Sequence, residues 1–316
     1  MISEIAPGEM INDVYLIRNP ILRSTTKGDL YIAMFLCDRT GQLNGRMWQA
    51  SEIIYNSLPK PGFIHVKGKS EVYQNNLQII INQVTPIDAS KVDLGDYIAR
   101  TKNDVGQMFA ESEKILDTIE NVKLKALVDA FLTDKPLMEN FKNCPAAVKL
   151  HHSYLGGLLE HTHSMLKAAA AILPLYPAVN RDLVLTGVFL HDMGKTEELC
   201  YDMGFSYSDS GQLIGHLAKG LLMINKKVEE LAASGIKIDS DIIDALGHIV
   251  LAHHGQYEFG SPKLPATAEA FMVNYIDDLD AKINQVTNLI ETDGGEENWT
   301  AYQTALQTRL YRKQIQ

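Results

Sequence analysis

The residues that decide the fold are LVLTGVFLHDMGK, at positions 183–195. An apolar helical pattern runs there directly into His191 and Asp192. Neighbouring side chains on a regular helix point about 100° apart, which ordinarily prevents them from binding one ion. At a helix end, where Gly194 lets the backbone turn, the two side chains can converge on one cation. The stretch therefore predicts a metal site at the end of a buried helix.

Histidines gather around this doublet. Nine of the ten histidines lie between positions 151 and 254. The candidate ligands besides the doublet lie on other predicted helices, and they are His161, His216, His253, His254 and Asp277. His253 follows Ile242, Leu246 and Ile249 at helical spacing, so its side chain is expected to face the helical core. Imidazole and carboxylate ligands without thiolate suit Mn²⁺, Fe²⁺, Co²⁺ or Zn²⁺.

A lone histidine, a His-Asp doublet and a distal aspartate resemble the signature of the HD-domain metallophosphohydrolases. The further histidines resemble the binuclear subgroup, in which the doublet aspartate bridges two metal ions. The first ion would then be held by His161, His191, Asp192 and Asp277. Asp278 and Asp280 are alternatives to the last, but we interpret them as carboxylates on the helix surface or behind a metal ligand. The second would be held by Asp192, His216 and His253, with His254 as a further candidate.

This resemblance implies a reaction as well as a ligand set. Two divalent ions can lower the pKa of a bridging water and hold a phosphate oxygen for in-line hydrolysis of a phosphodiester. Asp192 and Lys195 are the candidate catalytic residues, because a lysine there would neutralise charge on the phosphoryl oxygens. Lys195 and His152 are the candidate phosphate contacts, although His152 could equally be a packing residue.

The first part of the chain shows strand patterns. LYIAMFLC at 30–37 ends at the turn signal DRTG, and residues 43–48 read as its partner strand. Residues 62–68 and 77–81 form a second pair, with Asn75-Asn76 as the hairpin tip. Short strands in this order, with an interrupting segment at 50–57, predict an OB-like barrel. Four aromatic side chains are candidates for stacking on bases, with core packing the alternative for each: Tyr31, Phe35, Trp48 and Tyr73.

The apolar spacing becomes helical from Asp93 onward. We therefore expect a multi-domain fold, in which an N-terminal all-β OB-like barrel precedes an all-α HD domain. The expected boundaries are residues 1–90 for an OB-fold nucleic-acid-binding domain, 91–140 for a helical linker and 141–316 for the HD-type metallophosphohydrolase domain.

This domain pair is similar to the YhaM-type 3′-to-5′ exoribonucleases of bacteria. The stretches HHSYLGGLLEH at 151–161, HHG at 253–255 and IDDLDAK at 276–282 carry the same resemblance. It implies an enzyme that removes nucleotides from the 3′ end of single-stranded RNA, with two Mn²⁺ ions as cofactor and single-stranded DNA as a further candidate substrate. Two alternatives stay open, namely a phosphohydrolase of cyclic or mononucleotides and a non-catalytic OB-type nucleic-acid-binding protein.

Charge and cysteine usage limit the partners. The net charge is −10, yet residues 1–90 carry eight basic and eight acidic side chains, so the excess acid lies after them. General polyanion binders are usually basic, so RNA contact would depend on local sites and bound metal.

Three widely spaced cysteines fit thiols of the reducing cytoplasm. With no bilayer-length apolar run and no signal-peptide pattern, we expect a cytoplasmic protein without a membrane partner. Assembly into a homo-oligomer stays open.

Overall fold

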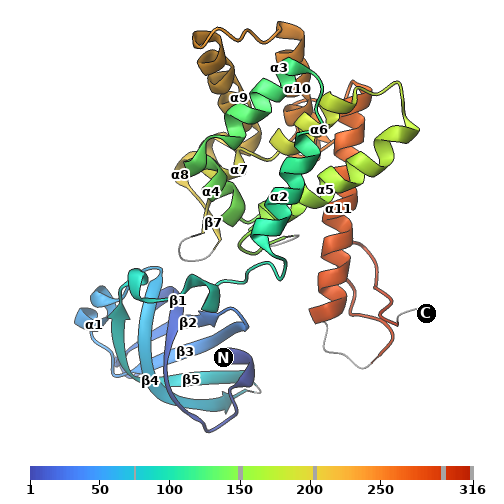
Figure 1. Cartoon of the computed structure of the whole chain (residues 1–316). Helices are drawn as coiled ribbons and strands as arrows, with labels where there is room; N and C mark the ends of the chain where they lie inside the picture. Colours follow the sequence, from blue (N-terminus) through green and yellow to red (C-terminus); the bar gives the residue numbers. More distant parts are fainter. Residues whose placement is uncertain (75, 149–151, 202–204, 293–296, 314–316) are drawn as a thin grey trace. The chain divides into compact units, whose positions relative to one another are not determined.

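The computed structural model describes residues 1–74, 76–148, 152–201, 205–292 and 297–313. They form two compact units, Met1–Arg100 and a second unit that begins at Thr101 (Figure 1). Among the described residues, no helix has both the length and the apolar character that crossing a membrane requires.

The first unit is a closed barrel of five strands, which confirms the predicted OB-like fold. The strands are β1 (Met10–Ser24), β2 (Leu30–Asp38), β3 (Gly41–Trp48), β4 (Gly62–Tyr73) and β5 (Asn76–Ile87), and their order around the barrel is β1-β2-β3-β5-β4. The pairing of β3 with β5 is parallel and the other pairings are antiparallel. The segment that interrupts the strands forms α1 (Glu52–Ser57). Of the expected hairpin tip, Asn75 lies outside the described residues, and Asn76 pairs with Tyr73.

Alternation along the strands decides which side chains fill the barrel. In β2, Ile32, Met34 and Leu36 are buried, whereas Tyr31 and Phe35 alternate with them and are only half-buried. Successive strand side chains point to opposite faces, so the two aromatic residues lie on the outside of the barrel. Short 3₁₀ turns follow β5 at η2 (Ala89–Lys91) and η3 (Leu94–Asp96), and the ring of Tyr97 packs on Phe63 at a centroid distance of 4.9 Å. The first unit therefore extends past residue 90.

The second unit is helical. Its elements are α2 (Val105–Leu116), α3 (Val122–Leu132), α4 (Lys135–Asn143), α5 (Gly157–Ile172), η4 (Leu173–Leu175), α6 (Arg181–Leu190), α7 (Lys195–Glu198), the short pair β6 (Leu199–Cys200) and β7 (Ser206–Tyr207), α8 (Asp209–Ile214), α9 (His216–Ala233), α10 (Ser240–Ala252), η5 (Tyr257–Phe259) and α11 (Ala268–Thr292). The continuous helix expected at 212–233 is divided in two, because Gly215 has a φ of 78° between α8 and α9. His216 therefore stands at the start of its own helix.

Residues 91–140 do not bridge two cores as a linker would. Met108 of α2, Leu127 and Phe131 of α3 and Phe141 of α4 are buried in the same apolar core as Val188 of α6. Helices α2 and α4 contact α5, and α3 contacts α4 and α6. We therefore propose a domain boundary near residue 100, with α2–α4 assigned to the helical domain.

Helix α6 runs through the middle of this core. Val184, Leu185, Val188 and Leu190 are fully buried, and α5, α10 and α11 all contact the helix (Figure 1). A helix buried on every side needs apolar residues around its whole circumference, as the sequence of α6 provides. The chain leaves α6 at His191, so the His-Asp doublet lies at the centre of the unit.

Candidate metal centre

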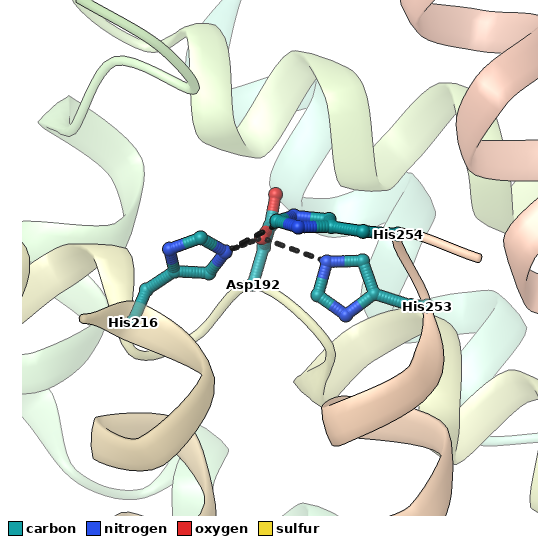
Figure 2. Close-up of side chains that lie close together, drawn as sticks. All are labelled: Asp192, His216, His253 and His254. Atoms are coloured by element: carbon teal, nitrogen blue, oxygen red, sulfur yellow. Dashed lines mark hydrogen bonds and ion pairs between the residues drawn. The ribbon is translucent and has the colours of Figure 1, made fainter. Parts of the chain in front are cut away.

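Asp192 is the centre of the candidate site and is 2% exposed. Its Oδ2 lies 3.4 Å from His191 Nε2 and 3.9 Å from His161 Nε2. Its Oδ1 lies 3.6 Å from His216 Nε2 and 3.5 Å from His253 Nε2. Figure 2 shows His216 and His253 directed at this carboxylate from two different helices. The two oxygens of Asp192 therefore face two separate groups of imidazoles.

Two further residues complete these groups. Asp277 Oδ1 lies 3.2 Å from His161 Nε2, and His254 Nε2 lies 3.3 Å from His216 Nε2 (Figure 2). The ligand atoms of Asp192, His216, His253 and His254 all lie within 4.8 Å of one another, as do those of His161, His191 and Asp192, and those of His191, His253 and Asp277. The structure thus brings together every metal ligand expected from the sequence, including His254.

The five candidate histidine ligands have the same ring orientation, with Nδ1 directed at a hydrogen-bond acceptor. Each Nδ1 faces an acceptor: Asp280 at 2.7 Å for His161, Val188 O at 2.8 Å for His191, Glu198 at 3.1 Å for His216, Val250 O at 2.8 Å for His253 and Phe259 O at 2.8 Å for His254. An imidazole that donates from Nδ1 can present the lone pair of Nε2 to a cation. The common orientation is what a cluster of metal ligands requires.

Local backbone structure produces this orientation. His191 and His253 lie at the C-terminal ends of α6 and α10, where the last carbonyls of a helix lack intrahelical partners. Each ring donates to the carbonyl three residues earlier. His216 begins α9, and Glu198 accepts from its backbone N–H at 2.9 Å as well as facing its ring. Gly194 permits the close approach of α7 to α9, since a Cβ there would meet His216 O at 2.1 Å.

The donor set fits divalent metal ions. His191 Nε2 and Asp192 Oδ1 are buried without a hydrogen-bond partner among the described residues. Leaving a buried polar atom unsatisfied typically costs about 1–3 kcal/mol, so native proteins rarely do so without a reason. Cations bound on the two sides of the Asp192 carboxylate would satisfy both atoms. The ligands are nitrogen and oxygen only, which suits Mn²⁺, Fe²⁺, Co²⁺ or Zn²⁺.

The charges of the site also favour a bound cation. Burial alone would raise the pKa of Asp192, but Lys195 and His191 outweigh burial and hold that pKa well below its usual range. Burial alone would lower the pKa of His161, yet its hydrogen bonds with Asp277 and Asp280 raise it to about 9. Two carboxylates thus favour positive charge at the position of His161 Nε2, whether a proton or a metal ion supplies it.

Known proteins resemble this chain over nearly all of its length. Residues 158–282 match the HD domain family. The 3′-5′ exoribonuclease YhaM of Bacillus subtilis is 31% identical over 315 residues, which cover 99% of this chain and 97% of that protein. The 3′-5′ exoribonuclease YhaM of Listeria welshimeri is 32% identical over 293 residues, covering 92% of this chain and 91% of that protein. This chain belongs to the YhaM family.

A solved structure also resembles the barrel. The second OB-fold domain of replication protein A from Methanococcus maripaludis is 25% identical, and the match covers 28% of this chain and 93% of that chain with a TM-score of 0.22.

Two of the expected phosphate contacts of this YhaM-family chain are buried. The Lys195 ammonium donates to Asp192 Oδ2 at 2.6 Å, and the residue is 9% exposed. Burial alone would lower the pKa of Lys195, but Asp192 outweighs burial and raises it, so the lysine is charged. His152 is 2% exposed and shares hydrogen bonds with Asp280 and Tyr154. His152 therefore lies on the Nδ1 side of His161, whereas the candidate metal ligands lie on its Nε2 side.

The barrel of this YhaM-family chain carries a cluster of aromatic residues on its outer face. The rings of Tyr31 and Trp48 lie 4.9 Å apart. The Arg46 guanidinium lies 5.9 Å from the ring centroid of Trp48 and 5.4 Å from that of Tyr73. Both Trp48 and Tyr73 are more than two-fifths exposed. Phe35, the fourth candidate, instead packs against the small core that residues 87–97 cover.

Three residues that contact candidate site residues in the structure are not indicated by any sequence pattern, namely Glu198, Arg46 and Tyr154. Glu198 has no motif of its own, because its role follows from the turn that brings α7 to the start of α9. Arg46 precedes Trp48 by two residues on a strand, so alternation could have placed both on one face. In the pairing of β1 with β2, Arg23 lies opposite Tyr31 and Arg18 lies opposite Phe35. The outer face of β1–β3 therefore carries positive charge, although the barrel as a whole is neutral.

Proposed function

We propose that this chain is a metal-dependent 3′-to-5′ exoribonuclease, which hydrolyses the phosphodiester bonds of single-stranded RNA from the 3′ end. The observation that carries the proposal is the set of imidazoles whose Nε2 atoms face Asp192. The set occurs in a chain that matches the 3′-5′ exoribonuclease YhaM of Bacillus subtilis over 99% of its length. The presence of every candidate ligand argues against the alternative of a non-catalytic nucleic-acid-binding protein.

The cofactor in this proposal is a pair of divalent cations, with Mn²⁺ expected. The proposed ligands of the first are His161, His191, Asp192 and Asp277, and those of the second are Asp192, His216, His253 and His254. When bound, two such ions lower the pKa of a water molecule and polarise the phosphate. Asp192 would join both, because its two oxygens face different imidazoles.

The residues of the chain supply the binding and the fixed charge. Asp192 would hold both cations beside the phosphate of the substrate. Lys195 keeps a positive charge beside that carboxylate, and an ammonium has three N–H donors, so the contact with Asp192 does not exhaust it. A phosphate entering next to Asp192 would meet this charge as negative charge develops on its oxygens. The close packing of α6 with α5, α10 and α11 would keep the ligands fixed during the reaction.

The outer face of the barrel supports a polymeric substrate over a mononucleotide. Tyr31, Trp48 and Tyr73 with Arg46 form a platform on which bases of a single strand could stack, as in other OB-type proteins. Stacking does not read the 2′-hydroxyl, so single-stranded DNA is a second candidate substrate. A phosphohydrolase of cyclic or mononucleotides would have no use for such a surface.

Compartment and assembly are part of the same proposal. We place the reaction in the cytoplasm, because RNA is the substrate and Cys37, Cys144 and Cys200 are free thiols. For self-association we propose an exposed apolar stripe along α11, made of Phe271, Tyr275, Leu279 and Ile283.

Incubation with 5′-labelled single-stranded RNA and Mn²⁺ tests the proposal. The expected product pattern is a descending ladder in steps of one nucleotide, absent when a chelator removes the metal. With 3′-labelled RNA, the label should appear first as a mononucleotide. Internal fragments without a ladder would indicate an endonuclease. Intact RNA beside rapid hydrolysis of cyclic or mononucleotides would favour the small-molecule alternative.

A further inference from the structure

A chain of hydrogen-bonded side chains lies on the Nδ1 side of His161, away from Asp192. Asp280 Oδ2 lies 2.7 Å from His161 Nδ1 and 2.9 Å from His152 Nε2. His152 Nδ1 lies 2.8 Å from the hydroxyl of Tyr154, which donates to Glu160 Oε1 at 2.9 Å. One carboxylate oxygen therefore joins a proposed metal ligand to a second histidine that no metal group around Asp192 includes.

The backbone holds His152 in this position against a conformational cost. Its φ is 46°, in the left-handed region that residues other than glycine rarely adopt. Its backbone N–H donates to Asn284 Oδ1 at 2.9 Å, one helical turn beyond Asp280 on α11. Its carbonyl lies against the first residue of α5, where a Cβ on Gly157 would meet it at 2.0 Å. Strain of this kind persists where the surroundings require one geometry, often at functional sites.

His161 needs a side-chain acceptor for a structural reason. His191 and His253 sit at helix ends and use carbonyls of the last turn. His161 lies within the first turns of α5, where the carbonyls already accept bonds from the helix. Only a group from another element can then fix its Nδ1, and α11 provides Asp280 for this purpose.

We propose that Asp280 is a positioning residue that aims His161 Nε2 at the metal, and that His152 acts by holding Asp280. The inference rests on the proposed metal centre and assigns His152 a role other than contact with phosphate. Both ring nitrogens of His152 are already within 2.9 Å of protein oxygens, which leaves neither nitrogen for a phosphate.

The substitution Asp280→Asn tests the role of the carboxylate. Both rings meet the same oxygen, Oδ2, so a carboxamide keeps an acceptor there but removes the negative charge that strengthens both hydrogen bonds. Titration calorimetry with Mn²⁺ should show a loss of affinity of about 10- to 100-fold, as is typical when a group behind a ligating histidine is changed. The matched control is Asp278→Asn, since Asp278 lies on the same helix, half-exposed, and pairs with Lys282. Mn²⁺ affinity that is equal in the two variants overturns the proposal.

The substitution His152→Gln separates positioning from substrate contact. We expect it to weaken Mn²⁺ binding in the wild-type background and to add little in the Asp280→Asn background, because the two residues act as one unit. A rise in KM for RNA with unchanged Mn²⁺ affinity would instead make His152 a substrate contact and overturn the inference. If Asp280→Asn fails to fold, His152→Gln alone still decides between these outcomes. Because metal affinity is measured without RNA, a wild-type chain that binds Mn²⁺ but leaves RNA intact would refute the proposed function alone.

Discussion

Replacing Trp48 by alanine should weaken the capture of RNA and leave phosphodiester chemistry intact. The side chain is 43% exposed on the outer face of the barrel, beside Tyr31 and Arg46. A stack between a base and an aromatic ring is worth about 1–3 kcal/mol, which corresponds to about 5- to 150-fold in affinity. Because nearly half of the ring is already in water, its removal should cost the fold little. KM for RNA should therefore rise by this factor.

The assay compares two substrates in the full-length chain. One is 5′-labelled single-stranded RNA, and the other is bis-p-nitrophenyl phosphate, which has no bases to stack. Trp48→Ala should raise KM for the first and leave hydrolysis of the second unchanged. The control is Trp299→Ala, which removes the chain's other tryptophan, half-exposed and packed at a tilt against Tyr311 in the helical unit. Equal losses on both substrates would mean that the barrel only supports the fold.

Three further outcomes follow from the metal centre and the charges. Mn²⁺ at about 100 times its Kd should stabilise the folded chain by about 2.7 kcal/mol per site, which a higher unfolding temperature would report and a chelator would reverse. An unfolding temperature that does not change with Mn²⁺ would contradict the proposed ligand set. Glu198→Gln should weaken Mn²⁺ binding about 10- to 100-fold, because it removes the negative charge that faces the His216 ring. A similar loss in the exposed neighbour Glu197→Gln would refute that assignment. RNA binding can be measured with Lys195→Ala, a variant expected to hydrolyse RNA slowly, and it should require Mn²⁺. A plot of the logarithm of RNA affinity against the logarithm of KCl concentration should have a slope no steeper than about −2, since three arginines face outward on β1–β3. Tight metal-free binding with a steeper slope would indicate a larger basic surface.

Much of the site could be predicted because its ligands repeat a local geometry. His191 and Asp192 follow an apolar helix, which is enough to predict the pair at a helix end. The backbone turn expected at Gly194 is not observed, since its φ of −62° is helical, and the glycine instead allows the close approach of His216. The barrel could be predicted because alternation along strands such as β2 separates inner from outer side chains. In both cases the information lies within a few consecutive residues.

The remainder depends on contacts between distant parts of the chain. Tyr31 and Phe35 share one face of β2, yet only the segment at 87–97 decides that Phe35 is covered. His152 and Asp280 are 128 residues apart in sequence and 2.9 Å apart in space. Spacing along the chain cannot distinguish a histidine that meets phosphate from one that holds a carboxylate.

The helical linker predicted at 91–140 illustrates the same dependence on distant contacts. Amphipathic helices such as α2 and α3 have an apolar face whether they bridge domains or complete a core. The contact of Phe131 with Phe189 of α6, at a ring-centroid distance of 6.4 Å, supports the proposed boundary near residue 100. The pattern thus predicted the helices and not the core to which they belong.

The most direct test of the account is a count of Mn²⁺ ions per chain in the wild type and in Asp192→Asn. Asp192 is the residue to which both proposed ligand groups belong, so one substitution should affect two ions at once. We expect two ions per chain in the wild type, none held tightly in a folded Asp192→Asn chain, and loss of RNA hydrolysis with them. A single ion in the wild type, or an unchanged count in Asp192→Asn, would contradict a shared aspartate at a two-metal centre.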